Sequence, residues 1–188
     1  MTSAKVDARA LPSYYWRSFF ALGTQYYAAA RLLFFANGAM VTGTLAHHAV
    51  EMFLKGALCS RVPITELRQK FKHSLPLLWD HFKMEKGDVA LARFDSTIAL
   101  LAAFDDLRYP DKVVGFAVQL SIEPTEILPT PHVSRNFQLV LRDLDALVQC
   151  ILAKASVDPL TLGAWLNKEG RAALARDNAT GIWTERKA

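Results

Sequence analysis

The sequence predicts an all-α fold: an antiparallel bundle of about five main helices, with one short extended insert before the last long helix. Apolar residues recur at i, i+3, i+4 and i+7 through most of the 188 residues, which is the spacing of amphipathic helices. Apolar residues make up 52% of the chain and charged residues 21%, as in an ordered globular protein. One segment alternates with period two instead, and it supplies the extended insert.

The length favours one domain. We expect a helical domain over residues 1–170, with its core at 13–154 and the extended insert at 113–131. Residues 171–188 are polar and basic, so we expect a loosely held tail there.

Several features indicate a cytoplasmic protein. The N-terminus lacks an apolar signal core, and Cys59 and Cys150 have no metal-ligand spacing around them, which suits reduced thiols. Leu32–Val50 carries no formal charge, but polar residues and glycines interrupt it, so we expect no membrane span. The net charge of +4 is compatible with a nucleic-acid partner and gives it only weak support.

An antiparallel helix pair is predicted at the N-terminal end. The aromatic-rich segment Ser13–Phe35 has a candidate break at Gly23-Thr24, where Thr24 is able to cap a second helical piece. Asn37-Gly38 tolerates left-handed backbone and turns the chain back. Tyr26–Phe35 is therefore expected to pack against Leu45–Leu58, the central core helix.

Two further helices are predicted in the middle of the chain. Ser74 is a good N-cap for a helix that runs to about Lys86. Gly87 ends this helix, and Asp88 caps the next one, which must stop before Pro110.

The extended insert is centred on Val113–Ile122, where apolar and small or polar residues alternate. Such a strand needs a partner, either a second extended piece around Thr125–Thr130 or the same segment of another subunit. Ser134 is predicted to cap the last long helix, and Asp158-Pro159 to start a short helix at Leu160–Lys168. The apolar stripe of the last long helix contains Phe137, Val140, Leu141, Leu144, Val148, Ile151 and Leu152.

The central helix Ala46–Leu58 has a polar flank that we consider first for function. His47, Glu51 and Lys55 follow at four-residue steps, and Glu four residues before Lys is the favourable order for an ion pair. His47, His48 and Glu51 also suggest a metal site. Adjacent histidines point about 100° apart on a helix, and no third and fourth ligand is evident, so we expect neither a metal nor a cofactor.

Four segments resemble the HEPN domain, a family of helical bundles found in prokaryotic toxin–antitoxin and defence systems. AHHAVEMFLKGAL at 46–58 is followed by HSLPLLW at 73–79 and DDLRYPDK at 105–112. YYAAARLLFFANG at 26–38 is similar to the first helix of that family. The resemblance implies a helical bundle, a homodimer, RNA or a nucleotide as ligand and, in one branch, a cognate nucleotidyltransferase-type partner.

Many HEPN members are ribonucleases that use an Arg followed, after four to six residues, by a His. Arg108 occupies the Arg position, but the matching positions for the His hold 113–115, which contain none. The resemblance thus implies a non-catalytic protein that binds RNA or a nucleotide, or that serves as a partner in a toxin–antitoxin or defence system. The implied ligand-binding residues are Glu51, Lys55, Arg108, Tyr109 and Lys112.

Two alternatives remain open. The first is a metal-independent ribonuclease in which Arg108 acts with His132 or His73; for His132, the insert must loop out and bring that residue back. The second is a dimerisation or scaffold module without a ligand, in which Glu51, Lys55 and Arg108 form an ion-pair network between helices. In either case Glu51 is expected within ion-pairing reach of Arg108 or Lys55.

Overall fold

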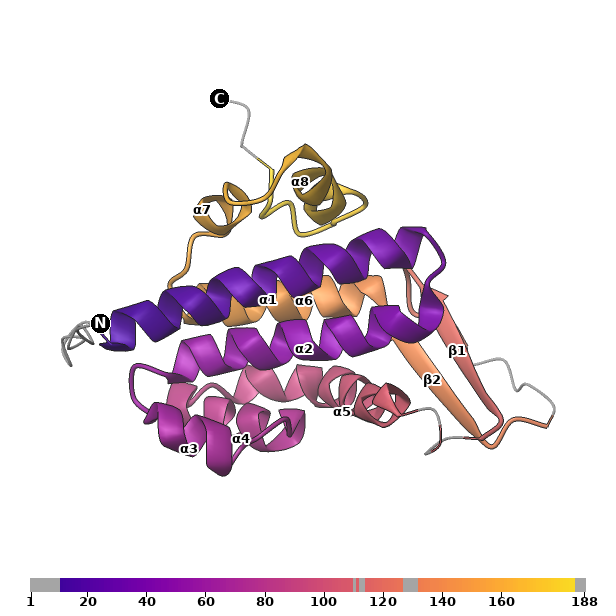
Figure 1. Cartoon of the computed structure of the whole chain (residues 1–188), viewed down its shortest axis with the longest axis horizontal. Coiled ribbons are helices and arrows are strands. Elements are labelled where there is room, and N and C mark those ends of the chain that lie inside the picture. Colours follow the sequence, from indigo (N-terminus) through magenta and orange to yellow (C-terminus); the bar gives the residue numbers. More distant parts are fainter. Residues whose placement is uncertain (1–10, 110, 112–113, 127–131, 185–188) are drawn as a thin grey trace, which may run out of the picture.

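The computed structural model describes residues 11–109, 111, 114–126 and 132–184. This part of the chain is mostly helical, with one small sheet of two parallel strands (Figure 1). The predicted helical class is confirmed at this level. The elements in order are α1 (Leu11–Phe35), α2 (Ala39–Leu58), α3 (Ile64–Gln69), α4 (Leu75–Lys86), the 3₁₀ helix η1 (Val89–Phe94), α5 (Asp95–Ala103), the 3₁₀ helix η2 (Phe104–Arg108), β1 (Phe116–Ser121), β2 (Arg135–Val140), α6 (Leu141–Lys154), α7 (Pro159–Gly163) and α8 (Lys168–Ala175).

α1 and α2 form the predicted antiparallel pair, and Asn37, at φ 57°, makes the left-handed turn between them. The expected break at Gly23-Thr24 is absent from α1. The Thr24 hydroxyl donates to the Phe20 carbonyl at 2.8 Å inside the helix instead of capping a new one. Gly23 serves packing, because a Cβ there would lie 2.8 Å from the Phe53 ring.

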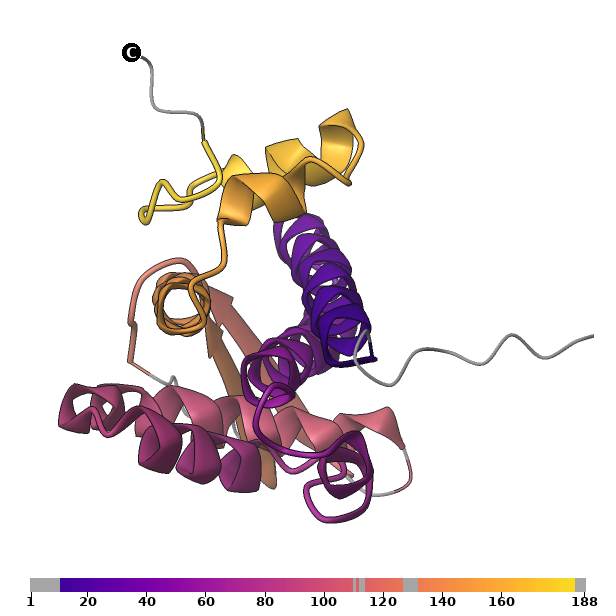
Figure 2. The same cartoon turned by 90° about the vertical axis from the view of Figure 1, so that its left-hand side faces the viewer.

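α2 is the central core helix, as predicted, and it contacts α1, α4, α5, α6 and η2. Its apolar stripe is buried, and this stripe includes Ala46, Ala49, Val50, Phe53 and Leu54. Figure 2 shows α2 between α1 on one side and the layer of α4 and α5 on the other. Nearly every other element is therefore placed by contact with α2 or with its partner α1.

The predicted caps of the middle helices are confirmed. The Ser74 hydroxyl accepts from the amide of Leu77, Gly87 ends α4 in the left-handed region at φ 60°, and Asp88 accepts from the amide of Ala90. The helix expected after Asp88 is divided into η1, α5 and η2, and it ends at Arg108 as expected.

The insert contains a strand, β1, as predicted, but its partner is β2. The two strands run parallel, with Phe116 opposite Arg135 and Ser121 opposite Val140. Within the described chain β1 therefore pairs with neither Thr125 nor Glu126, and residues 127–131 lie outside the described chain. Pairing with the same segment of another subunit stays a prediction.

The prediction that Ser134 caps the last helix was wrong. The Ser134 hydroxyl donates to the carbonyls of Val114 and Gly115 at the start of the strand pair. The helix begins only at Leu141, in α6. Apolar residues at Phe137 and Val140 fit a helical stripe, but they also fit a strand, and the ladder with β1 decides between the two.

The region after Gly170 differs from the loosely held tail that we expected. α8 packs on α1 (Figure 2). The side chains of Leu174 and Trp183 are both buried. The helix expected at Leu160–Lys168 is replaced by α7 and α8, although Asp158 caps α7 as predicted. Residues 185–188 lie outside the described chain.

A buried ion pair holds this region to the bundle. Arg31 of α1 is fully buried and pairs with Asp145 of α6, which also accepts from the Tyr27 hydroxyl. The Arg31 guanidinium donates further to the carbonyls of Ala173, at 2.8 Å, and Arg176. One side chain thus joins α1, α6 and the end of α8.

Among the described residues, none of the helices combines the length and the hydropathy that a membrane span requires.

Gly43→Ala should destabilise the fold through α2. A Cβ at Gly43 would lie 1.9 Å from the Phe104 ring, so α2 and η2 must separate. We expect the free energy of unfolding to fall by about 1–3 kcal/mol in urea denaturation. Gly163→Ala is the matched control, because its Cβ meets Trp183 at an ordinary 3.6 Å. Equal stability of the two variants would show that this packing is wrong.

Candidate functional site

The polar flank of α2 is built around the carboxylate of Glu51, which is fully buried. Oε1 of Glu51 accepts from Nζ of Lys55 at 2.6 Å, as the four-residue spacing predicted. Nδ1 of His48 lies 3.3 Å from Oε2, and Nδ1 of His73 lies 3.1 Å from Oε1 and 3.2 Å from Oε2. We refer to His47, His48, Glu51, Lys55 and His73 as the Glu51 cluster. The expectation that Glu51 lies within ion-pairing reach of Lys55 is confirmed.

A turn before α4 brings His73 to this carboxylate. Lys72 adopts φ 48°, and its carbonyl accepts from Nζ of Lys55 at 2.5 Å. The same ammonium group therefore binds Glu51 and the backbone that carries His73. The sequence suggested His73 only as an alternative catalytic partner of Arg108, because no regular spacing links it to Glu51, 22 residues earlier.

The cluster keeps Glu51 charged. Burial would raise the pKa of Glu51, but hydrogen bonds from His48 and Lys55, the charge of Lys55 and a hydrogen bond from His73 outweigh it and lower the pKa to about 2. A buried anion is thus present in the site at all ordinary pH values.

His47 lies at the buried end of the cluster, with one ring nitrogen in use. Its Nδ1 is 3.1 Å from the Leu101 carbonyl, and because a carbonyl only accepts, Nδ1 carries the proton. Burial lowers the pKa of His47, which favours the neutral ring. Nε2 then presents a lone pair, has no hydrogen-bond partner, and lies 4.0 Å from Oε2 of Glu51.

Arg108 stands at the rim of this region and does not pair with Glu51. Its Nη1 donates to Asp105 at 2.9 Å, and about 30% of the Arg108 side chain is exposed. The bond to Asp105 raises the pKa of Arg108, and the charge of Glu51 contributes in the same direction. Arg108 is thus an electrostatic neighbour of the cluster.

The other predicted site residues lie outside the cluster. The Tyr109 side chain is 53% exposed, beside Arg108 in the sequence. His132 is exposed, with φ 67° and its carbonyl next to Gly115. Within the described chain, no hydrogen bond joins His132 to Arg108. Lys112 lies outside the described residues.

Lys55 also forms part of a second feature, a cavity of about 320 Å³ between α1, the end of α2 and α3. Two cations, Lys55 and Arg68, line it together with aromatic and aliphatic side chains. Sequence reasoning missed this cavity, because it combines residues from three separate elements. The other lining residues are Tyr14, Tyr15, Ser18, Phe19, Leu22 and Ile64.

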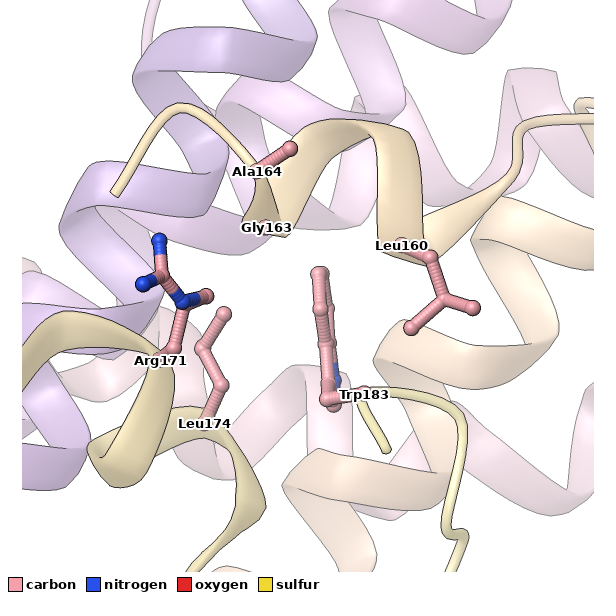
Figure 3. Close-up of a pocket in the computed structure, with 6 residues that line it drawn as sticks. All are labelled: Leu160, Gly163, Ala164, Arg171, Leu174 and Trp183. Carbon is pink, nitrogen blue, oxygen red and sulfur yellow. The ribbon is translucent and has the colours of Figure 1, made fainter. Parts of the chain in front are cut away.

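A cavity of about 360 Å³ lies far along the chain from the Glu51 cluster, between α7 and α8. Figure 3 shows the Trp183 ring standing between Leu160 and Leu174, with the Arg171 guanidinium to one side. The indole nitrogen of Trp183 is buried without a partner. Of the predicted site residues that the structure describes, none lines this cavity.

Comparisons with protein-family models, with curated proteins and with solved structures each found no match.

Removing the Glu51 carboxylate should destabilise the fold strongly. Glu51→Ala leaves the buried ammonium of Lys55 without its counter-charge, and we expect a loss of about 3–5 kcal/mol in urea denaturation. Glu66→Ala is the matched control, since Glu66 and Lys70 form the same i,i+4 pair at 2.9 Å on the surface. That variant should lose less than about 1 kcal/mol. Similar losses in the two variants would contradict the burial of the Glu51 pair.

Proposed function

We propose that the chain is a non-catalytic HEPN-like protein that binds single-stranded RNA or a nucleotide on the side of α2 that carries the Glu51 cluster. The observation that carries this proposal is the cavity that Lys55 and Arg68 line together with Tyr14, Tyr15 and other apolar side chains. Cations for a phosphate beside aromatic rings for a base are the chemistry that nucleotide binding uses.

The cavity and the rim of the cluster are linked through α2. Lys55 lines the cavity and binds Glu51, whose carboxylate is also contacted by His73. The charge of Asp105, the partner of Arg108, acts to raise the pKa of His47, which lies one turn before Glu51. We infer that RNA with a base in the cavity passes the exposed side chain of His73 on its way to Arg108.

The exposed groups on this path suit a phosphate backbone. Arg108 uses Nη1 for Asp105, so its other nitrogens are able to donate to a phosphate. The His73 side chain is 56% exposed above the buried carboxylate. The buried carboxylate of Glu51 positions this rim and, as an anion, does not itself bind the phosphate.

The proposed function is non-catalytic because the sequence lacks, after Arg108, the His that HEPN ribonucleases place after their Arg. Membership of a toxin–antitoxin or defence system, with a nucleotidyltransferase-type partner, belongs to the same proposal. A homodimer and a cytoplasmic location also stay predictions.

Exposed apolar side chains that a second copy could cover include Leu22 and Leu32 on α1 and Met40 and Val41 on α2.

One observation favours the ribonuclease alternative, in which Arg108 acts with His132 or His73. Asp106 of η2 pairs with Arg135 at 2.5 Å, and this contact returns the segment after His132 to the helix that carries Arg108. His73 already contacts a carboxylate, which is able to orient its ring for proton transfer. The scaffold alternative requires a closed region, whereas the rim at His73 is exposed.

Arg108→Ala should weaken RNA binding. We expect the wild-type chain to bind a single-stranded RNA oligonucleotide at low salt, measured by fluorescence anisotropy, with affinity that falls as salt rises. Loss of one phosphate contact should reduce the slope of log affinity against log salt by about 0.7. Isothermal titration with ATP tests the nucleotide form of the proposal.

The control is Arg61→Ala, because Arg61 is 73% exposed and pairs only with Glu85 among the described salt bridges. The proposal fails if the wild-type chain binds neither probe, or if Arg108→Ala and Arg61→Ala behave alike. Cleavage of the RNA by wild-type protein in the presence of a chelator, lost in His132→Ala or His73→Ala, would replace it with the ribonuclease alternative.

A further inference from the structure

We propose that His47, His48 and Glu51 form a binding site for a divalent transition-metal ion of the Zn²⁺ class. One ring nitrogen of each histidine and one oxygen of the carboxylate all lie within 4.8 Å of one another. This site shares the Glu51 cluster with the RNA surface proposed above, but the inference does not rest on RNA binding.

The strongest evidence is the free nitrogen of His47. The ring is almost fully buried, and the bond from Nδ1 to the Leu101 carbonyl fixes both its tautomer and its orientation. Metal-binding histidines are held in this way, by a second-shell carbonyl on the nitrogen that does not bind the ion. Nε2 is left without a partner and faces a carboxylate oxygen 4.0 Å away. A lone pair facing an anion calls for a cation between them.

His48 supplies the second nitrogen. Its Nδ1 lies 3.3 Å from the same oxygen, Oε2 of Glu51, to which it donates in the metal-free chain, so its proton must be released or move to Nε2 when the ion binds. The rings of His47 and His48 are nearly perpendicular, at 86°, with centroids 5.4 Å apart. The helix does point the two side chains apart, as we expected. The two residues converge because they use different ring nitrogens, Nε2 of one and Nδ1 of the other.

The spacing fits a small four-coordinate ion. With bonds of about 2.1 Å, two ligands of a tetrahedral zinc ion lie about 3.4 Å apart. The observed separations from Oε2 of Glu51 are 3.3 Å to His48 and 4.0 Å to His47, and all three ligand atoms lie within 4.8 Å of one another, so the histidine rings must draw closer to bind one ion.

The surroundings leave a side for a fourth ligand. Nδ1 of His73 lies 3.2 Å from Oε2, and its side chain is 56% exposed, so either His73 or a water molecule is able to complete the shell. Lys55 binds Oε1, the other oxygen, and its positive charge weakens cation binding. Two imidazoles with one carboxylate favour Zn²⁺ over Mg²⁺ or Ca²⁺, which prefer shells of oxygen ligands.

The test uses the full chain after treatment with a chelator, titrated with Zn²⁺ by calorimetry in the absence of RNA. We expect one ion per chain and a rise in Tm on addition of Zn²⁺. Co²⁺ should give the visible absorption of a tetrahedral site. His47→Gln should lower the affinity by at least the roughly 10- to 100-fold that loss of an outer-shell partner costs.

His81→Ala is the control histidine, because His81 packs against Phe71 and does not belong to the metal-binding group. It should bind Zn²⁺ as the wild type does. Circular dichroism of each metal-free variant verifies folding, and His48→Gln provides a second ligand variant if His47→Gln does not fold. The proposal is overturned if wild-type protein binds no stoichiometric Zn²⁺, or if both ligand variants bind as tightly as His81→Ala. Since no RNA is present, either result leaves the RNA-binding proposal to its own test.

Discussion

The constraint on which this structure depends is a carboxylate buried in the middle of its central helix. An unpaired anion in that position would be very unfavourable, so the chain must surround Glu51 with donors. Lys55 comes from the same helix, and its second bond, to the Lys72 carbonyl, holds the turn that delivers His73. The need to satisfy one buried charge thereby sets how α2, the turn and α4 meet.

A second buried charge, Arg31, shows what a purely structural solution looks like in the same molecule. Its guanidinium donates to Asp145 and to two backbone carbonyls, and these bonds tie α1 to α6 and α8. The Glu51 cluster differs, because it gathers three histidines around the carboxylate; an unpartnered buried atom is common to both sites, Nε2 of His47 here and Oδ2 of Asp145 there. It also reaches the surface at His73. A purely structural pair requires neither of these features.

Much of the helical framework could be predicted from local chemistry. Ser74, Gly87 and Asp158 act within a few residues of themselves, so their roles as helix caps and as a helix end are visible in the sequence. β2 could not be predicted, since its apolar positions fit either period and only pairing with β1 decides. The docking of Trp183 could not be predicted for a similar reason. The segment after Gly170 is polar and basic overall, and its two buried apolar side chains, Leu174 and Trp183, belong to a region that packs on α1, where Tyr27 contacts Trp183.

In the candidate site too, only the contacts that depend on local spacing could be predicted from the sequence. The Glu51–Lys55 pair follows from helical spacing, whereas the approach of His73 depends on the turn at Lys72. The expectation that no metal binds rests on the angle between adjacent side chains and on the lack of further ligands. It does not account for the two nitrogens that each imidazole offers or for the approach of His73. Lys112 cannot be compared, because it lies outside the described residues.

The central claim is that burial holds His47 neutral beside Glu51, with its proton on Nδ1 and a free lone pair on Nε2. Nitrogen NMR of the histidine rings in chelator-treated protein near neutral pH tests this directly. The structure predicts that His47 shows a protonated Nδ1 and an unprotonated Nε2. A protonated Nε2, in either the other tautomer or the imidazolium, would contradict the geometry on which the site depends.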